Sequence, residues 1–182
     1  MNNPQINDIA TALKYSPPEN QSKKYESLFI DIDEGAIKLP KFQRDFVWSK
    51  ERTARLIDSI IKGFPVGTFI FWKTSEDLKN HTNIGNHALP DAPKGDMRNY
   101  VLDGQQRITS LYAVRKGIRL TKDKREVDYK DDILIDLDPN LKAEDPICFA
   151  APSDGKNCIS AHRLLSAGIT DLMDEYDKET VK

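Results

Sequence analysis

The chain has 182 residues and a formal net charge of −2 at pH 7, and 38% of its residues are hydrophobic. These values predict one globular domain with its own core, and they exclude a disordered chain. They also exclude a uniformly basic protein that coats nucleic acid, and two cysteines are too few for a disulfide scaffold. The polar start and the lack of a long apolar run predict a cytoplasmic protein without a secretory signal or a membrane span.

The N-terminal part of the sequence predicts two helices and a strand. Residues 1–21 are expected to form an arm with a short helix, because Asn3-Pro4 suits a cap followed by a first helical position. Apolar residues at helical spacing predict a second helix from about Ser22 to Gly35, and residues 36–39 are expected to form a strand.

The clearest predicted helix begins after Ser49, which is expected to cap it, and ends at Gly63. Residues 68–72 are aromatic, apolar or β-branched throughout, so they are expected to form a strand that is covered on both faces. Trp48 and Trp72 are expected to lie in the core.

Residues 74–99 show no periodicity and are predicted to form a long loop, which is either a functional lid, a family-specific insertion or a disordered segment. His81 and His87 lie in this segment and are expected to face solvent. The elements expected after it are a strand over 100–102, a helix over 105–116 stopped by Gly117, strands over 132–137 and 148–150, a strand-to-helix step over 158–167 and an acidic tail over 171–182.

Charge is distributed unevenly along the chain. Residues 38–73 carry eight Lys and Arg against three acidic residues, whereas residues 126–154 carry two Lys against nine acidic residues. One end of the domain is therefore expected to attract phosphate groups.

Two polar strings stand at predicted strand ends. The first contains Gln43-Arg44 and lies between aromatic residues, and the second is Asp103-Gly104-Gln105-Gln106-Arg107, between a strand and a helix. Free backbone N–H groups and the positive end of a helix favour an anion at such a junction. The alternative, purely structural interpretation of the second string is a turn with a helix cap. The corresponding interpretation of the first string is a solvated turn.

The residue types of the second string suit phosphate recognition. Gly104 would let a ligand approach the backbone, Gln105 and Gln106 would offer amide groups, and Arg107 would offer a fork for phosphate oxygens. Asp103 would either cap the helix or hold a Mg²⁺ ion that bridges phosphates.

Other candidate sites have weaker signals. A zinc site is conceivable at Cys148, Cys158 and His162, although the second half of any ligand spacing is missing. The carboxylates of residues 131–138 are either a metal site or a solvated strand edge. Walker-type phosphate loops, GxGxxG and HExxH are absent from the sequence.

Three strings in this order closely resemble the N-terminal domain of GmrSD-type restriction endonucleases. They are Leu39-Pro40-Lys41-Phe42-Gln43-Arg44-Asp45-Phe46-Val47-Trp48, the run from Leu56 to Gly67, and Val101-Leu102-Asp103-Gly104-Gln105-Gln106-Arg107-Ile108-Thr109. The resemblance runs over roughly residues 25–117. It predicts that residues 22–170 form one domain, which is named the DGQQR domain after the string Asp103–Arg107.

The resemblance implies an α+β fold similar to the ParB and sulfiredoxin group, with a small mixed sheet flanked by helices and a phosphate site at a strand-to-helix junction. It implies a role in phage defence, with nucleotide hydrolysis licensing the cleavage of DNA that is often modified. The resemblance also implies an HNH-type nuclease domain or subunit as a partner. No HNH-like histidine cluster is present in this sequence, so the DNA-cutting half is expected to be either absent or supplied elsewhere. A homodimer is left open.

The functional residues that the resemblance implies are Gln43, Arg44, Asp103, Gln105, Gln106 and Arg107. The leading hypothesis is Mg²⁺-dependent binding and hydrolysis of a nucleoside triphosphate. The backbone of Gly104–Gln106 and Arg107 would grip the phosphates, and Asp103 would position the metal or the attacking water. Arg44 would stabilise the transferred phosphoryl group, and Gln43 would orient the nucleotide or the water.

Two rival hypotheses remain. In the first, the domain is a non-catalytic module that binds DNA or senses modified DNA through the basic stretch, and its binding would be steeply salt-dependent. In the second, the domain is itself a ParB-like nuclease, although the sequence lacks a clear paired-carboxylate metal site near the two strings.

Overall fold

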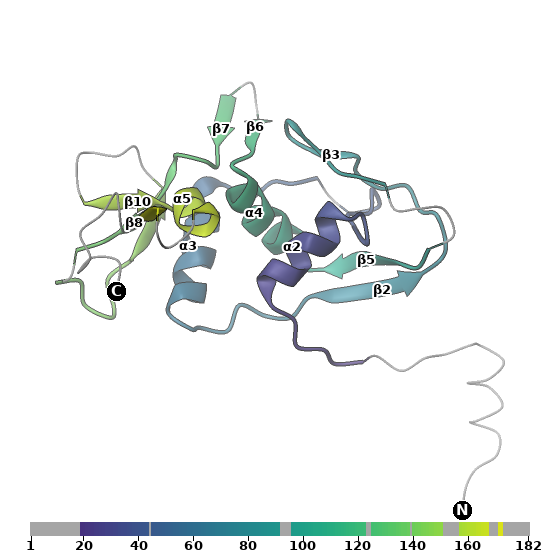
Figure 1. Ribbon diagram of the computed structural model, residues 1–182, viewed down its shortest axis with the longest axis horizontal. Helices are drawn as coiled ribbons and strands as arrows, with labels where there is room; N and C mark the ends of the chain where they lie inside the picture. The colour runs from purple at the N-terminus through teal and green to yellow at the C-terminus, as the bar shows by residue number, and fades with distance from the viewer. Residues whose placement is uncertain are drawn as a thin grey trace, which may run out of the picture.

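A computed structural model describes residues 19–43, 45–91, 96–122, 125–138, 140–150, 157–167 and 171–172. Within these residues the chain forms a mixed α+β structure (Figure 1). Its helices are α2 (Tyr25–Asp33), α3 (Lys50–Ile61), α4 (Gln105–Lys116) and α5 (Ala161–Ser166). Most of the predicted arm over 1–21 and of the predicted tail over 171–182 lies outside the described residues, so both stay predictions.

The first sheet has the strand order β1-β5-β2 and is mixed. β1 (Ile37–Lys38) runs parallel to the central strand β5 (Arg98–Asp103), and β2 (Ile70–Thr74) runs antiparallel on its other side. The predicted α+β fold with a small mixed sheet is confirmed. Only Gly104 separates Asp103, the last residue of this central strand, from the start of α4.

The second sheet is antiparallel and lies in the C-terminal part of the chain. Its central strand is β8 (Ile133–Asp136), with β9 (Cys148–Ala150) and β10 (Cys158–Ser160) on either side. All three strands were predicted within a residue or two. Two hairpins complete the described elements: β3 (Asn83–Ile84) with β4 (His87–Ala88), and β6 (Arg119–Lys122) with β7 (Arg125–Asp128).

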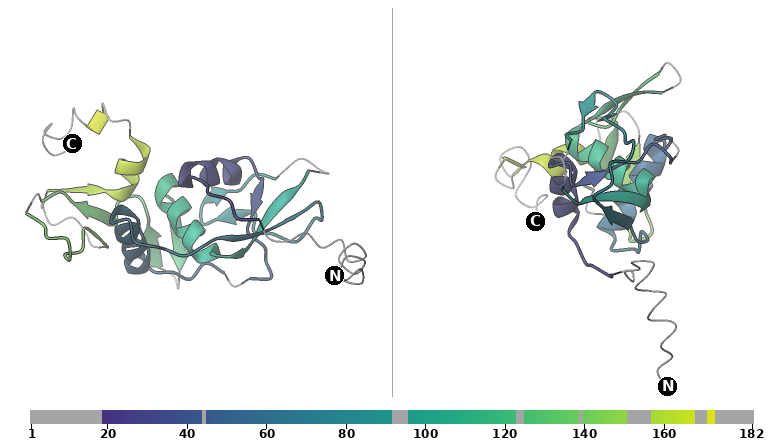
Figure 2. Two further views of the ribbon diagram at one scale, coloured as in Figure 1. Left: turned by 90° about the horizontal axis from the view of Figure 1, so that it is seen from below. Right: turned by 90° about the vertical axis from the view of Figure 1, so that its right-hand side faces the viewer.

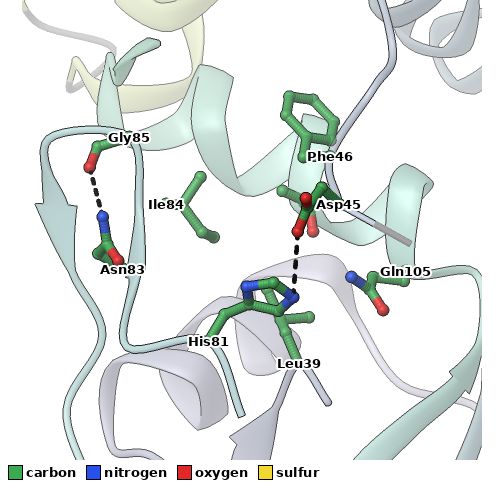
Figure 3. Close-up of a pocket in the computed structure, with 9 residues that line it drawn as sticks. Leu39, Asp45, Phe46, His81, Asn83, Ile84, Gly85 and Gln105 are labelled. Atoms are coloured by element: carbon green, nitrogen blue, oxygen red, sulfur yellow. Dashed lines mark hydrogen bonds and ion pairs between the residues drawn. The ribbon is translucent and has the colours of Figure 1, made fainter. Parts of the chain in front are cut away.

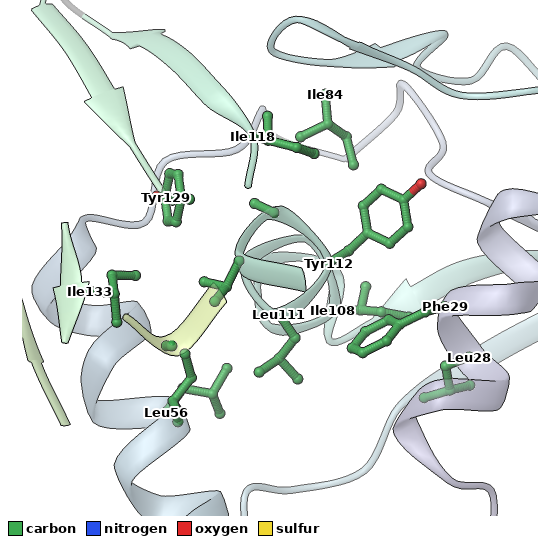
Figure 4. Packing of buried hydrophobic residues seen from close by; sticks show 14 of the residues in the cluster. Leu28, Phe29, Leu56, Ile84, Ile108, Leu111, Tyr112, Ile118, Tyr129 and Ile133 are labelled. Atoms are coloured by element: carbon green, nitrogen blue, oxygen red, sulfur yellow. The ribbon is translucent and has the colours of Figure 1, made fainter. Parts of the chain in front are cut away.

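Helix α4 lies between the two three-stranded sheets (Figures 1 and 2). Figure 4 shows its side chains Leu111 and Tyr112 among those of Phe29 from α2 and Leu56 from α3, and all four belong to one buried cluster. Four polar residues of α4 are buried as well: Gln105, Gln106, Thr109 and Ser110. Most of the helix is therefore enclosed by the rest of the fold.

Helix α3 starts as its cap predicts, because the Ser49 hydroxyl accepts a hydrogen bond from the backbone N–H of Arg52. Its last turn reaches the second sheet. The Asp58 carboxylate accepts hydrogen bonds from the N–H groups of Ile147 (2.7 Å) and Cys148 (3.1 Å), and it pairs with Lys62 at 3.0 Å. Asp58 thus joins α3 to the start of β9.

The expectation that residues 68–72 are covered on both faces is wrong. The strand runs from Ile70 to Thr74 at the edge of its sheet, and its side chains Ile70 and Trp72 are 51% and 43% exposed. Side chains two residues apart in a strand point to the same face, so Ile70 and Trp72 mark one face of β2 that is open to solvent. Trp72 is consequently not a core residue, whereas Trp48 packs against the core as predicted.

The interpretation of residues 74–99 as a long loop is only partly correct. The segment contains the β3–β4 hairpin and ends inside β5. Ile84 belongs to the buried core, and the His87 ring nitrogen Nε2 lies 2.9 Å from the hydroxyl oxygen of Tyr112. His81 and His87 are both partly buried, so the expectation that they face solvent is wrong. In residues 74–91 and 96–99, tertiary contacts stabilise structure for which the sequence shows no periodic signal.

Candidate functional site

The turn between β5 and α4 leaves the N-terminus of the helix without a side-chain cap. Gly104 is the N-cap residue, with a left-handed φ of +88°, and it provides no side-chain hydrogen bond. Asp103 does not cap the helix; its carboxylate instead accepts a hydrogen bond of 2.8 Å from Nη2 of Arg107. The Asp103 side chain is 61% exposed, so a negatively charged group stands in solvent beside an uncapped helix end.

The Arg107 guanidinium is engaged by acceptors of the chain itself. Its Nη1 donates to the carbonyl oxygen of Val66, and its Nη2 donates to the carbonyl oxygen of Thr68 at 2.8 Å as well as to Asp103. The guanidinium carbon lies 5.2 Å from the centre of the Phe69 ring. Arg107 therefore holds the loop before β2 against the start of α4 and orients Asp103, rather than presenting a vacant fork.

The structure brings the two predicted polar strings together. The Gln43 side chain donates to the carbonyl oxygens of Val101 (2.8 Å) and Leu102 (2.7 Å) at the end of β5. The Gln106 side chain donates to the carbonyl oxygen of Asp45 (3.0 Å) and accepts from the N–H of Val47 (2.9 Å). The side-chain amides of Gln43 and Gln106 thus hold the backbone in place around the junction between β5 and α4. Arg44 lies outside the described residues.

The close packing around Gly104 leads to a first prediction. A Cβ atom there would lie 2.5 Å from a ring carbon of Phe69, whereas a Cβ atom at Gly63, which also has a positive φ, would meet nothing within 4 Å. We expect Gly104→Ala to lower the free energy of unfolding by about 2 kcal/mol and Gly63→Ala by about 1 kcal/mol. Urea denaturation of both variants measures the difference, and equal losses would show that the contact with Phe69 is unimportant.

A small pocket opens beside the first turn of α4 (Figure 3). Its volume is about 110 Å³, and its lining includes Asp45, His81, Gln105 and Thr109. Figure 3 shows Asp45 and His81 facing one another, and the distance between Oδ1 of Asp45 and Nε2 of His81 is 4.0 Å. Gln105 is a predicted site residue. Asp45 directly follows the first polar string. His81 was expected to face solvent, and the sequence predicted no role in a site for His81 or Thr109.

The zinc interpretation is wrong for the residues that the structure describes. Among them, no group of three His, Cys, Asp or Glu side chains could hold a metal ion. Burial raises the pKa of Cys148 to about 12, which keeps its thiol protonated, and the His162 ring nitrogen Nδ1 lies 2.9 Å from the carbonyl oxygen of Val114. The carboxylates of residues 131–138 are among the described residues, and they do not form a metal site of three ligands either.

Ion pairs neutralise several lysines of the basic stretch. Lys38 is 4% exposed and pairs with Asp91 at 3.1 Å, and Lys50 pairs with Asp132 at 2.7 Å. The local excess of positive charge at the surface is therefore smaller than the residue count alone predicts. None of the helices in the described parts of the chain is long and apolar enough to cross a membrane.

Comparisons with known proteins identify the family of this chain. The model of the family described as GmrSD restriction endonuclease, N-terminal domain, matches residues 25–175. An uncharacterized protein of Methanocaldococcus jannaschii is 37% identical over 83 residues, which are 43% of this chain and 14% of that relative. The chain thus spans only a small part of that relative's length. Because the family model covers most of the chain and includes both polar strings, the chain belongs to the family of GmrSD restriction endonuclease N-terminal domains.

Proposed function

We propose that this domain binds a nucleoside triphosphate, with its phosphates at the N-terminus of α4, and hydrolyses it with the help of Mg²⁺. The observation that carries this proposal is the uncapped helix end at Gly104 next to the exposed carboxylate of Asp103. The first N–H groups of a helix have no acceptor within the helix and attract phosphate oxygens.

The residues of the junction have different tasks in this proposal. Gly104 allows phosphate oxygens close to the backbone, since it has no side chain. Arg107 is a positioning residue, because its hydrogen bonds to Thr68 and Asp103 fix the geometry around the helix end. Gln43 and Gln106 hold the first polar string against this junction. Arg44 is proposed, from the family pattern alone, to stabilise charge on the transferred phosphoryl group.

The donor set fits a metal that arrives with the nucleotide. Mg²⁺ usually takes one or two protein carboxylates and completes its shell with phosphate oxygens and water. Asp103 offers one exposed carboxylate, and the described residues contain no larger group of ligands. Mg²⁺ bound in this way would offset phosphate charge, while Asp103 would hold it or orient the attacking water.

Membership of a restriction endonuclease family makes DNA the partner that nucleotide turnover would serve. We propose that the nuclease step belongs to another domain or subunit of HNH type. A non-catalytic, DNA-sensing role remains the alternative, and it predicts nucleotide-independent DNA binding that weakens steeply with salt.

The proposal is tested at Asp103. We expect Asp103→Asn to weaken Mg²⁺-dependent nucleotide binding about tenfold, equivalent to ~1.4 kcal/mol, because one charged metal ligand is lost. Calorimetry with ATP, CTP, GTP and UTP gives the dissociation constants, and phosphate release gives the turnover. The exposed residue Asp131 supplies the control variant Asp131→Asn, which should match the wild type.

Two outcomes would count against this function. Equal affinity and equal phosphate release for the wild type and Asp103→Asn would remove Asp103 from the site. If the wild-type chain binds nucleotide but releases no phosphate, the domain is a nucleotide-binding module rather than a hydrolase.

A further inference from the structure

The pocket beside α4 takes no part in the phosphate site proposed above. It begins at Gln105, the first residue of α4, and extends past Thr109, one turn further along the same face. Asp45, which directly follows the first polar string, His81 from the segment before β3 and Asn83 complete the polar part of its wall. The pocket therefore lies within the reach of a molecule bound at the end of the helix.

Thr109 marks this pocket as a site for a polar ligand. Its side chain is 2% exposed, and within the described residues its Oγ1 has no hydrogen-bond partner. Other buried hydroxyls in helices donate to the carbonyl four residues earlier, as Thr53 does to Ser49 (3.2 Å) and Ser110 does to Gln106 (2.7 Å). A buried hydroxyl without a partner costs about 1–3 kcal/mol, so a ligand that satisfies it gains affinity.

The other polar groups indicate what that ligand carries. His81 Nε2 is also buried without a hydrogen bond within the described residues, and it lies 4.0 Å from the Asp45 carboxylate. An ionised carboxylate only accepts hydrogen bonds, whereas an imidazole and a hydroxyl can donate or accept. Because these two atoms are only 4.0 Å apart, a ligand hydroxyl beside the pair can donate to the Asp45 carboxylate and form a second hydrogen bond with His81 Nε2. This chemistry suits a ring with neighbouring hydroxyls.

The size of the pocket restricts the ring. A cavity of about 150 Å³ accommodates benzene, so the 110 Å³ here suits a single five-membered ring and is small for a two-ring base. The side chain of Asp45 is 89% exposed, which places its carboxylate at the mouth of the pocket.

We propose that this pocket binds the ribose hydroxyls of the nucleotide, so that the domain selects ribonucleotides over deoxyribonucleotides. The proposal rests on the proposed function, because the phosphates at the end of α4 bring the sugar to Gln105. Asp45 and His81 bind one hydroxyl at the mouth, and Thr109 binds the other inside.

The experiment compares ribonucleotides with their 2′-deoxy and 3′-deoxy forms, and includes tripolyphosphate as a probe of the phosphate site alone. We expect the wild-type chain to bind the ribonucleotide about tenfold more tightly than at least one deoxy form, the loss of one well-placed hydrogen bond. The variants Asp45→Asn, His81→Ala and Thr109→Val should bring this ratio to within about twofold, while tripolyphosphate affinity stays unchanged. Thr53→Val, which removes an equally buried helical hydroxyl outside the pocket, should keep the full ratio.

The outcomes separate this inference from the function on which it rests. If ribonucleotides and both deoxy forms bind equally well, the ribose pocket is overturned and the phosphate site stands. A ratio that survives in all three pocket variants overturns it too. If neither tripolyphosphate nor any nucleotide binds, the phosphate site and the ribose pocket fail together.

Discussion

Replacing Arg107 by alanine is expected to lower the free energy of unfolding by about 3–4 kcal/mol, the largest effect that we predict for a single polar side chain. The guanidinium donates to the carbonyl oxygens of Val66 and Thr68 and to Asp103, and its side chain is only 17% exposed. In the variant these acceptors lose a charged donor, and the Phe69 ring loses the cation packed over it.

Urea denaturation of the wild type, Arg107→Ala and Arg107→Lys measures this effect. Arg107→Lys should recover less than half of the loss, because one ammonium group cannot reproduce the planar fork that reaches three acceptors. Arg55 is an exposed arginine of α3, and Arg55→Ala should change stability by less than about 0.5 kcal/mol. An Arg107→Ala variant as stable as Arg55→Ala would show that the junction does not depend on the guanidinium.

The second large effect is expected at Asp58. Asp58→Ala should lower the free energy of unfolding by about 3 kcal/mol, because the N–H groups of Ile147 and Cys148 lose their acceptor and Lys62 loses its partner. Asp58→Asn keeps an oxygen that can accept both N–H groups, so it should cost about 1 kcal/mol. The same denaturation experiment measures both, with Asp131→Ala as the exposed control. Equal costs for alanine and asparagine would contradict the role of the oxygen acceptor.

The contribution of Asp58 should depend on pH. Burial alone would raise the pKa of this carboxyl, but the hydrogen bonds from Lys62, Ile147 and Cys148 outweigh burial and hold the pKa below its ordinary value. A lowered folded-state pKa stabilises the protein above the unfolded-state value of about 3.9, and this stabilisation is lost as pH falls through the folded-state pKa. The stability difference between the wild type and Asp58→Ala should therefore be constant near neutral pH and shrink in acid. A stability difference between the wild type and Asp58→Ala that grows in acid would contradict this prediction.

Local signals were sufficient for most elements. Ser49 and Gly63 bracket α3, and Gly117, with a φ of +59°, ends α4 where the sequence predicts. These elements depend on interactions within a few residues, which a cap, a glycine and an apolar stripe record directly. The β6–β7 hairpin was not predicted, because its strands carry charged residues next to isolated apolar ones and present no clear alternation.

The polar strings were recognised from the sequence, but the contacts of their side chains within the chain were not. Arg107 and Gln106 were expected to face a ligand, whereas the structure engages them with backbone groups of the chain. Carbonyl groups that approach from other segments leave no trace in the sequence around Asp103. The identity of such acceptors is decided only when the chain folds.

The composition class, the order of most elements and the two strings that mark the family are predictable from the residues alone, because they follow from local chemistry. The folded chain was needed to show that most of α4 is enclosed, that Trp72 lies on an exposed edge strand and that His81 meets Asp45 and Thr109 in one pocket. Contacts between residues far apart in the chain depend on packing geometry. No periodicity, cap or motif within a short window encodes that geometry.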